Sequence, residues 1–277
     1  MAEISRLYYA LGGGLGHAAR AAAAAHTLAW RGPVTVLASH PAAPQLPAPE
    51  NVAWRIVPPE ISRDARAIRG WVQAEVNAAR PDQFAIDCFP AGILGELSPD
   101  LFGGECVHVC RRLRWENYRP LLGTSAPPIR FSKAYACEEL HPGQHEYLAG
   151  VSAAIEPLAL VDPPRAAGGP RALPEGAWLV VHAGSGEEIA RLEAYARKLM
   201  ALEGCPGAPL VIAAPAGESP ALADAAPLFP LAARIVCAAG FNTMRQTEAF
   251  AAQRRVLPME RRFDDQFWRA ARCRDLP

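Results

Sequence analysis

The stretch Leu7-Tyr8-Tyr9-Ala10-Leu11-Gly12-Gly13-Gly14-Leu15-Gly16-His17 joins an apolar run to a glycine loop. An alanine-rich segment at 18–30 follows and is expected to form a helix, and another apolar run follows at 34–38. A strand, a glycine turn and a helix in this order are typical of a parallel sheet that is covered on both faces. We therefore predict an α/β fold.

The same alternation continues along the 277 residues and is interrupted once. Further strands are expected at 52–57, 84–87, 106–111, 135–138, 178–182, 210–213, 235–237 and 256–257. Further helices are expected at 61–79, 187–202, 242–252 and 264–272, with another opening at 93–97. Proline and glycine are concentrated at 157–176, which favours a linker. We predict two Rossmann-like doubly wound domains facing a cleft, at 1–156 and 177–277.

The composition excludes several classes of protein. Hydrophobic residues make up 51% and charged residues 20%, an ordinary globular mixture. Lys+Arg and Asp+Glu both number 28, so a strongly basic nucleic-acid binder is not expected. The seven cysteines are scattered without a CxxC pair, which favours a reducing compartment. Since no apolar run is long enough to span a membrane, we expect a cytoplasmic protein.

The first glycine loop fits several kinds of ligand site to different degrees. Backbone N–H groups at a helix start suit a phosphate, although a tight turn without a ligand explains the same glycines. Gly14-x-Gly16-x-x-Ala19 resembles a dinucleotide fingerprint, but no carboxylate follows the second strand, at 38–41. The chain has no Asp-x-Asp, and Cys106, His108 and Cys110 on one strand face lack a fourth ligand. We expect neither a cofactor nor a metal.

The sequence resembles the GT-B glycosyltransferases, in the branch similar to MurG and the UDP-glycosyltransferases. The resemblance rests on the glycine loop that ends at His17, on Ala239-Gly240-Phe241-Asn242-Thr243, and on Pro258 followed by Asp265-Gln266. It implies that the C-terminal domain, of the family 28 type, binds a nucleotide sugar. The implied nucleotide-sugar-binding residues are Gly14, Gly16, Gly184, Ser185, Gly186, Phe229, Gly240, Asn242, Thr243, Gln246, Asp265 and Gln266.

Two features depart from the family pattern. Family members place a ribose-binding glutamate where Gln246 stands, twelve residues before Pro258. A neutral amide binds a hydroxyl less strongly than a carboxylate does. Glu187 and Glu188 would also repel a diphosphate at the second glycine loop, Gly184-Ser185-Gly186, where Ser185 could instead be a plain helix cap.

The resemblance implies that His17 and Asp87 form a catalytic pair. A positive helix end disfavours imidazolium, so His17 is suited to act as a base, and Asp87 follows a strand at its carboxyl end. Packing or capping roles remain the alternatives for both residues. The implied activity is an inverting, metal-independent transfer of a hexose from a nucleotide diphosphate sugar, expected to be UDP-linked, to an unknown acceptor hydroxyl.

Other functions and partners stay open at this point. Gly14-Leu15-Gly16-His17-Ala18-Ala19-Arg20 also resembles the start of the sugar-nucleotide hydrolase of the pseudaminic acid pathway. A non-catalytic sugar-nucleotide binding protein is the third hypothesis. Arg111-Arg112-x-Arg114 is either a solvated edge or a site for an anionic acceptor or lipid headgroup. A lipid acceptor would add a peripheral membrane contact.

Overall fold

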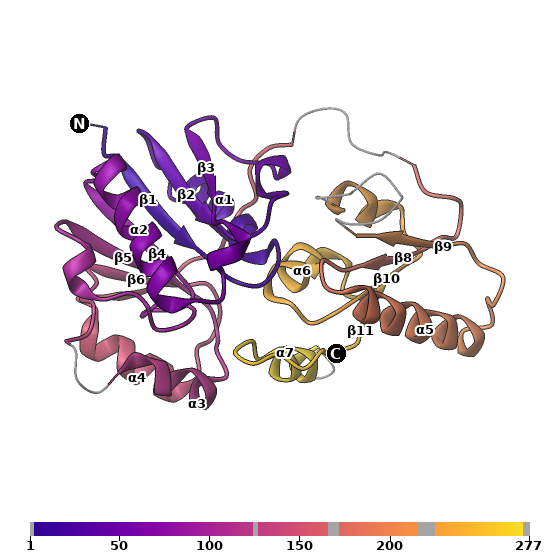
Figure 1. Ribbon diagram of the computed structural model, residues 1–277. Helices are drawn as coiled ribbons and strands as arrows, with labels where there is room; N and C mark the ends of the chain where they lie inside the picture. The colour runs from indigo at the N-terminus through magenta and orange to yellow at the C-terminus, as the bar shows by residue number, and fades with distance from the viewer. Residues whose placement is uncertain (1–2, 124–126, 166–171, 215–224, 274–277) are drawn as a thin grey trace. The chain divides into compact units, whose positions relative to one another are not determined.

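The computed structural model describes residues 3–123, 127–165, 172–214 and 225–273. The chain divides into two compact units, shown in Figure 1. Unit 1 comprises 1–164 and 262–264, and unit 2 comprises 165–261 and 265–277. No helix in the described ranges is both long enough and apolar enough to cross a membrane.

Unit 1 is built on a seven-stranded parallel sheet. The order of its strands is β3-β2-β1-β4-β5-β6-β7, and each strand is parallel to its neighbours. The strands are β1 Arg6–Ala10, β2 Val34–Ala38, β3 Val52–Ile56, β4 Gln83–Asp87, β5 Glu105–Cys110, β6 Lys133–Ala136 and β7 Ile155–Pro157. Strand order reverses between β1 and β4, and ligands of open parallel sheets bind beyond the carboxyl ends of the strands at such a point. The sequence predicted all of these strands except β7.

The helices of unit 1 begin and end where local side-chain chemistry allows. They are α1 Gly16–Thr27, α2 Ala65–Ala79, α3 Trp115–Tyr118 and α4 Pro142–Val151. The Asp64 carboxylate caps α2 by accepting the N–H groups of Arg66 and Ala67 at 2.9 and 3.0 Å. The helix ends at Arg80, which has a left-handed φ of 44°. The short helix α3 and α4 were not predicted.

The predicted helix opening at 93–97 is wrong, because these residues form a loop. Gly92 and Gly95 have φ values of 84° and 80°, which interrupt a right-handed helix. The Glu96 carboxylate folds back on the loop, where it accepts the N–H of Leu94 at 2.8 Å and bonds the Tyr9 hydroxyl. These bonds replace the backbone bonds that a helix would form.

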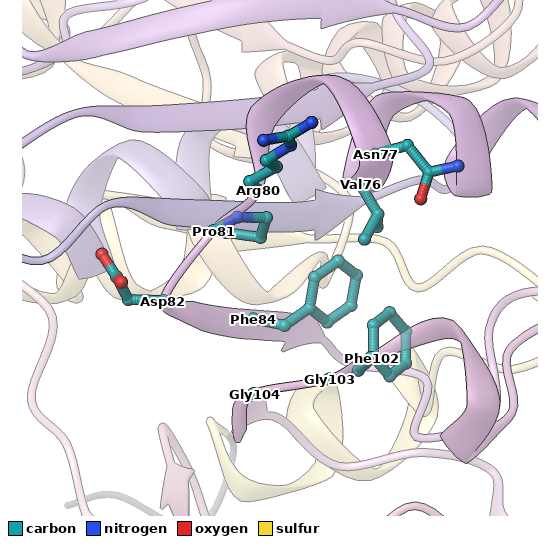
Figure 2. A pocket seen from close by; sticks show the side chains of 9 residues that line it. All are labelled: Val76, Asn77, Arg80, Pro81, Asp82, Phe84, Phe102, Gly103 and Gly104. Carbon is teal, nitrogen blue, oxygen red and sulfur yellow. The ribbon is translucent and has the colours of Figure 1, made fainter.

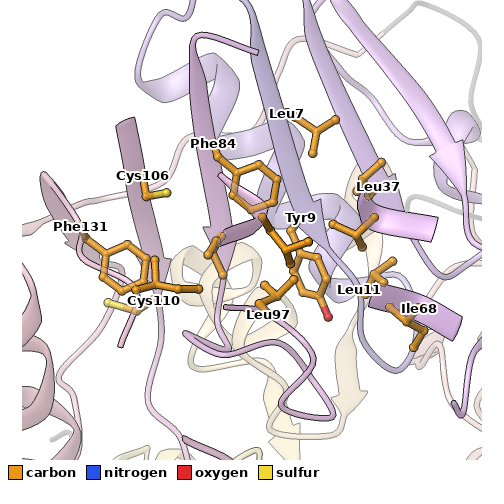
Figure 3. Close-up of a cluster of buried hydrophobic side chains, with 14 of the residues drawn as sticks. Leu7, Tyr9, Leu11, Leu37, Ile68, Phe84, Leu97, Cys106, Cys110 and Phe131 are labelled. Carbon is orange, nitrogen blue, oxygen red and sulfur yellow. The ribbon is translucent and has the colours of Figure 1, made fainter. Parts of the chain in front are cut away.

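The core of unit 1 lies between the sheet and its covering helices. Figure 3 shows side chains of β1, β2, β4 and β5 gathered there, among them Leu7, Tyr9 and Phe84. Leu7, Tyr8, Tyr9 and Ala10 are at most 1% exposed, as expected for a strand that is buried on both faces. This packing fixes the carboxyl ends of β1 and β4 side by side.

Unit 2 contains a four-stranded parallel sheet in the order β11-β10-β8-β9. Its strands are β8 Trp178–Val181, β9 Leu210–Ala213, β10 Arg234–Cys237 and β11 Arg254–Val256, and its helices are α5 Gly186–Leu202, α6 Phe241–Gln246 and α7 Gln266–Arg272. The predicted helix 242–252 stops early. Thr247 donates its hydroxyl to the Thr243 carbonyl at 2.6 Å, and a separate 3₁₀ turn follows at Glu248–Phe250.

Residues 262–264 belong to unit 1, although the predicted C-terminal domain over 177–277 contains them. The Phe263 carbonyl accepts the N–H of Arg114 at 2.8 Å, and Asp264 forms an antiparallel bridge with Leu113. The Phe263 ring meets Phe89 and Tyr118 edge to face in a buried aromatic cluster. Helix α7 therefore begins at Gln266 and not at the predicted Asp264.

Candidate functional site

His17 and Asp87, the pair that the family resemblance implies, lie in contact in unit 1. Strand β1 leads through the glycine loop into α1, whose second residue is His17. Asp87 ends the neighbouring strand β4. The His17 Nδ1 and Asp87 Oδ2 atoms lie 2.6 Å apart, and the two residues are 6% and 0% exposed. An ionised carboxylate can only accept, so neutral His17 carries its proton on Nδ1.

The other ring nitrogen of His17, Nε2, lies against Gly12. A Cβ atom added to Gly12 would overlap Nε2 and the neighbouring Cδ2. Within the described residues Nε2 makes no hydrogen bond. A glycine is therefore needed at position 12 so that the His17 ring can pack against the backbone. The sequence of the glycine run did not indicate this requirement. Gly14 has a φ of 80° in the loop, and Gly16 is the first residue of α1.

Arg20 and Tyr8 complete the surroundings of Asp87, and neither was predicted as a site residue. Arg20 donates Nε to Oδ1 at 2.7 Å and Nη2 to Oδ2 at 2.6 Å. The Tyr8 hydroxyl donates to Oδ1 at 3.1 Å. With His17, these donors fill the four acceptor positions of a carboxylate. Arg20 lies one helical turn after His17, a spacing that places both on one face of α1.

The electrostatics of this site favour an ionised Asp87 beside a neutral His17. Burial alone would raise the pKa of Asp87, but the Arg20 charge and the bonds from His17 outweigh it and hold that pKa well below its usual range. Burial lowers the pKa of His17 below its usual 6.5, and the Arg20 and Arg111 charges act in the same direction. A neutral imidazole with an open Nε2 can accept a proton.

Cys88 and Phe89 continue the chain beyond Asp87. Cys88 has a left-handed φ of 63°, an uncommon conformation for a side chain with a Cβ atom. It turns the chain so that the Phe89 ring lies 5.3 Å from the His17 ring, centroid to centroid. Phe89 also packs in the aromatic cluster that includes Phe263.

The arginine run after β5 is not a solvated edge. Arg111 and Arg112 are only 6% and 8% exposed. Arg111 donates to Asp264 Oδ1 at 2.5 Å and to the Arg112 carbonyl at 3.0 Å. Its charge is therefore paired within unit 1, close enough to His17 to act on its pKa.

In unit 2, the second glycine loop is closed by the chain's own side chains. Ser185 caps α5, and Glu188 completes a capping box by accepting the Ser185 N–H at 3.2 Å. Arg261 donates hydrogen bonds from both terminal nitrogens to the Glu188 carboxylate. His182 Nε2 lies 3.0 Å from Glu188 Oε2. The bonds from Arg261 lower the pKa of Glu188 to about 2. Gly184 has no room for a Cβ atom beside Glu188 and His182.

The remaining predicted residues of unit 2 lie near two helix starts. Gly240 caps α6, and Asn242 and Thr243 lie in its first turn. Gln246 is the last residue of α6. Asn242, Thr243 and Gln246 are half-buried. Asp265 caps α7 by accepting the N–H of Trp268 at 3.3 Å. These residues therefore lie at the starts of α6 and α7 and, for Gln246, at the end of α6.

Two predicted residues have structural partners inside unit 2. The Gln266 side chain is 4% exposed and accepts the Met259 N–H at 3.0 Å. Phe229 is 2% exposed and packs edge to face with Phe250 in a hydrophobic cluster. Packing and backbone bonding account for both positions.

The cysteines and histidine of β5 do not form a metal site. No group of three or more His, Cys, Asp or Glu side chains in the described ranges is arranged to hold a metal ion. Cys106 and Cys110 pack in the hydrophobic core, and His108 stacks on Phe131 at 5.0 Å. Burial lowers the pKa of His108 to about 4.

Two hollows of unit 1 lie at opposite ends of its strands, one at the amino ends and one at the carboxyl ends. One, of about 630 Å³, lies where β4 and β5 begin, beside the stacked rings of Phe84 and Phe102 (Figure 2). It is about 10 Å along β4 from Asp87 and is separate from the His17 site. The other, of about 840 Å³, is lined by residues that include Cys137 and Leu158. It lies at the carboxyl ends of β6 and β7, the same end of the sheet at which Asp87 ends β4.

Solved structures share this architecture. A "glycotransferase of kitacinnamycin" aligns over 99% of this chain and 85% of its own, with a TM-score of 0.61 and 14% identity. UGT89C1 of Arabidopsis thaliana, complexed with UDP-L-rhamnose, aligns over 98% and 82%, with a TM-score of 0.58 and 12% identity. The chain has a GT-B glycosyltransferase fold.

The GT-B fold does not by itself determine the reaction. UDP-N-acetylglucosamine 2-epimerase from Rickettsia bellii aligns over 94% of this chain and 80% of its own, with a TM-score of 0.54 and 8% identity. No family model matches the sequence, and a search of curated proteins finds no similar one. The function is therefore argued from the site.

Proposed function

We propose that the chain is an inverting, metal-independent glycosyltransferase of the hexosyltransferase type. The donor is a nucleoside diphosphate sugar, expected to be UDP-linked, and the acceptor is a hydroxyl group. The 2.6 Å contact between His17 and Asp87 carries the proposal, because it fixes the Nδ1 proton and leaves Nε2 to act as a base. The GT-B neighbours, one of them complexed with UDP-L-rhamnose, support a nucleotide-sugar donor.

The proposed step transfers one proton and exchanges one bond. The acceptor hydroxyl gives its proton to His17 Nε2, and its oxygen bonds to the anomeric carbon. The bond from that carbon to the diphosphate breaks, and the electron pair leaves with the phosphate oxygen. Asp87 stabilises the imidazolium that forms. Attack opposite the leaving group inverts the anomeric configuration.

An assay with and without acceptors tests this proposal. UDP-sugars and TDP-sugars are incubated with the protein, first alone and then with a panel of hydroxyl acceptors, in the presence of EDTA. The proposal expects nucleotide release that depends on an acceptor and persists with EDTA. A loss of release with EDTA that added Mg²⁺ restores would overturn metal independence.

A hydrolase is the second candidate, and Arg20 favours it. Arg20 completes the Gly-x-Gly-His-x-x-Arg pattern of the hydrolase resemblance, and it contacts the same carboxylate as His17. Water would then replace the acceptor at His17. Equal nucleotide release with and without acceptors, accompanied by free sugar, would select the hydrolase. Binding without release would select a sugar-nucleotide binding protein.

A substitution at Gln246 tests where the ribose binds. Gln246→Glu is expected to tighten nucleotide binding by about 1 kcal/mol, because a charged acceptor replaces a neutral one at a ribose hydroxyl. Isothermal titration with UDP and TDP measures the change. Glu248→Gln, on the exposed 3₁₀ turn that follows, serves as the control. Unchanged or weaker binding of both nucleotides to Gln246→Glu would contradict this placement.

A substitution at Glu188 tests whether the diphosphate reaches the second glycine loop. Glu188→Gln removes a negative charge from the start of α5 and releases Arg261, so we expect nucleoside diphosphates to bind several-fold more tightly. Glu187→Gln makes the same charge change at a neighbouring exposed position and should have a smaller effect. Equal, small effects of the two variants in titrations would place the diphosphate away from this loop.

A further inference from the structure

Arg20 is a buried cation that shares a carboxylate with the candidate base. It is 2% exposed and holds Asp87 with two hydrogen bonds of 2.6 and 2.7 Å. The same Nη2 atom lies 3.3 Å from His17 Nδ1. Arg20 Nη2 and His17 Nδ1 both carry hydrogen when His17 is neutral. Arg20 therefore lies in contact with His17 but does not accept its proton.

We propose that Arg20 is a positioning residue that keeps Asp87 ionised and aimed at His17, and keeps His17 uncharged in mildly acidic solution. The inference rests on the proposed role of His17 as the base. This role of Arg20 differs from a purely structural one, because a guanidinium group that only filled space would not change the protonation of His17.

The geometry gives two reasons for this role. A planar guanidinium bonded to both carboxylate oxygens fixes the plane of the Asp87 carboxylate, and hence the direction in which it accepts from His17. A fixed positive charge close to the imidazole also opposes a second positive charge there. The base therefore remains in its proton-accepting form at lower pH than a histidine paired with aspartate alone.

The other charged groups near His17 act on its protonation in opposite directions. Asp87, from β4, favours the imidazolium, whereas Arg111, from the segment after β5, opposes it. The Arg111 charge is paired with Asp264 at 2.5 Å. Tyr8, from β1, donates to Asp87 and adds no charge. The Arg20 guanidinium differs from Arg111 in that it contacts both members of the His17–Asp87 pair directly.

The test is an NMR titration of the His17 imidazole in the free protein, which does not depend on turnover. Arg20→Met should raise the titration midpoint of His17 by roughly one pH unit or more, because the opposing charge is lost while Asp87 remains. If the protein is an active transferase or hydrolase, the acid limb of kcat/KM should move to higher pH by the same amount. Arg69→Met, which removes an arginine paired with Asp100 in the same unit, is the control and should leave the midpoint unchanged.

A second variant keeps the test decisive if Arg20→Met does not fold. Arg20→Lys retains the positive charge but loses the two-pronged guanidinium contact with Asp87. The titration midpoint of His17 should therefore stay near the wild-type value while kcat falls. A folded Arg20→Met protein with an unchanged His17 midpoint would overturn the proposal, as would an Arg20→Lys protein whose midpoint rises by a full unit. Because the titration is read without substrate, its result for Arg20 holds even if no glycosyl transfer is found.

Discussion

Replacing His17 with alanine is expected to lower turnover by roughly 10²–10⁴-fold, with nucleotide affinity nearly unchanged. The imidazole is the proposed proton acceptor in unit 1, whereas the proposed nucleotide contacts other than Gly14 and Gly16 belong to unit 2. Asp87 keeps its two bonds to Arg20 in this variant, so the carboxylate remains paired and the fold is retained. Turnover is measured as nucleotide release, and affinity by titration.

Two comparisons make the His17 result specific. His26→Ala, in the last turn of the same helix, should leave turnover unchanged. His17→Ala combined with Asp87→Asn should be little slower than His17→Ala alone, because the carboxylate acts through the imidazole. If His17→Ala abolished nucleotide binding and the residual turnover followed occupancy, His17 would be a phosphate ligand and not the base.

Replacing Asp87 with alanine is expected to lower the free energy of unfolding by about 3–5 kcal/mol. Asp87 is fully buried, and its loss leaves the buried Arg20 guanidinium without the carboxylate that compensates its charge. The Tyr8 hydroxyl loses its acceptor as well. If Asp87 only oriented His17 and stabilised its charge, Asp87→Ala would reduce turnover modestly. The structure adds a large effect on stability, measured by urea denaturation.

The charge argument predicts a partial rescue. Asp87→Ala combined with Arg20→Met removes both charges and should unfold at higher urea than Asp87→Ala alone, because the buried guanidinium that lacks the Asp87 carboxylate to balance its charge is itself removed. Asp82→Ala is the matched control, since Asp82 is exposed, precedes the same strand and accepts hydrogen bonds from Ser5. A double variant less stable than Asp87→Ala would show that Arg20 stabilises the fold through other contacts.

The sequence alone determined the parallel α/β class and nearly all of the strands, whereas the pairing of His17 with Asp87 was implied by the family resemblance. Strands buried on both faces read as continuous apolar runs, and these are local patterns. The structure accounts for the contact between the two residues, because the parallel neighbours β1 and β4 bring their carboxyl ends together, with the glycine loop and His17 after β1 and Asp87 at the end of β4. The loop at 93–97 was mispredicted because a side chain, Glu96, completes its hydrogen bonds.

Only the tertiary structure decided which charges lie beside these residues. Arg20 follows His17 by one helical turn, but the chain order does not show that this face of α1 is buried against Asp87. Glu188 and Arg261 lie 73 positions apart, and Phe263 packs on Phe89 from still farther along the chain. Periodicity and strand ends are set by neighbouring residues, whereas an ion pair depends on where two distant segments meet, and burial then determines how strongly its charges act.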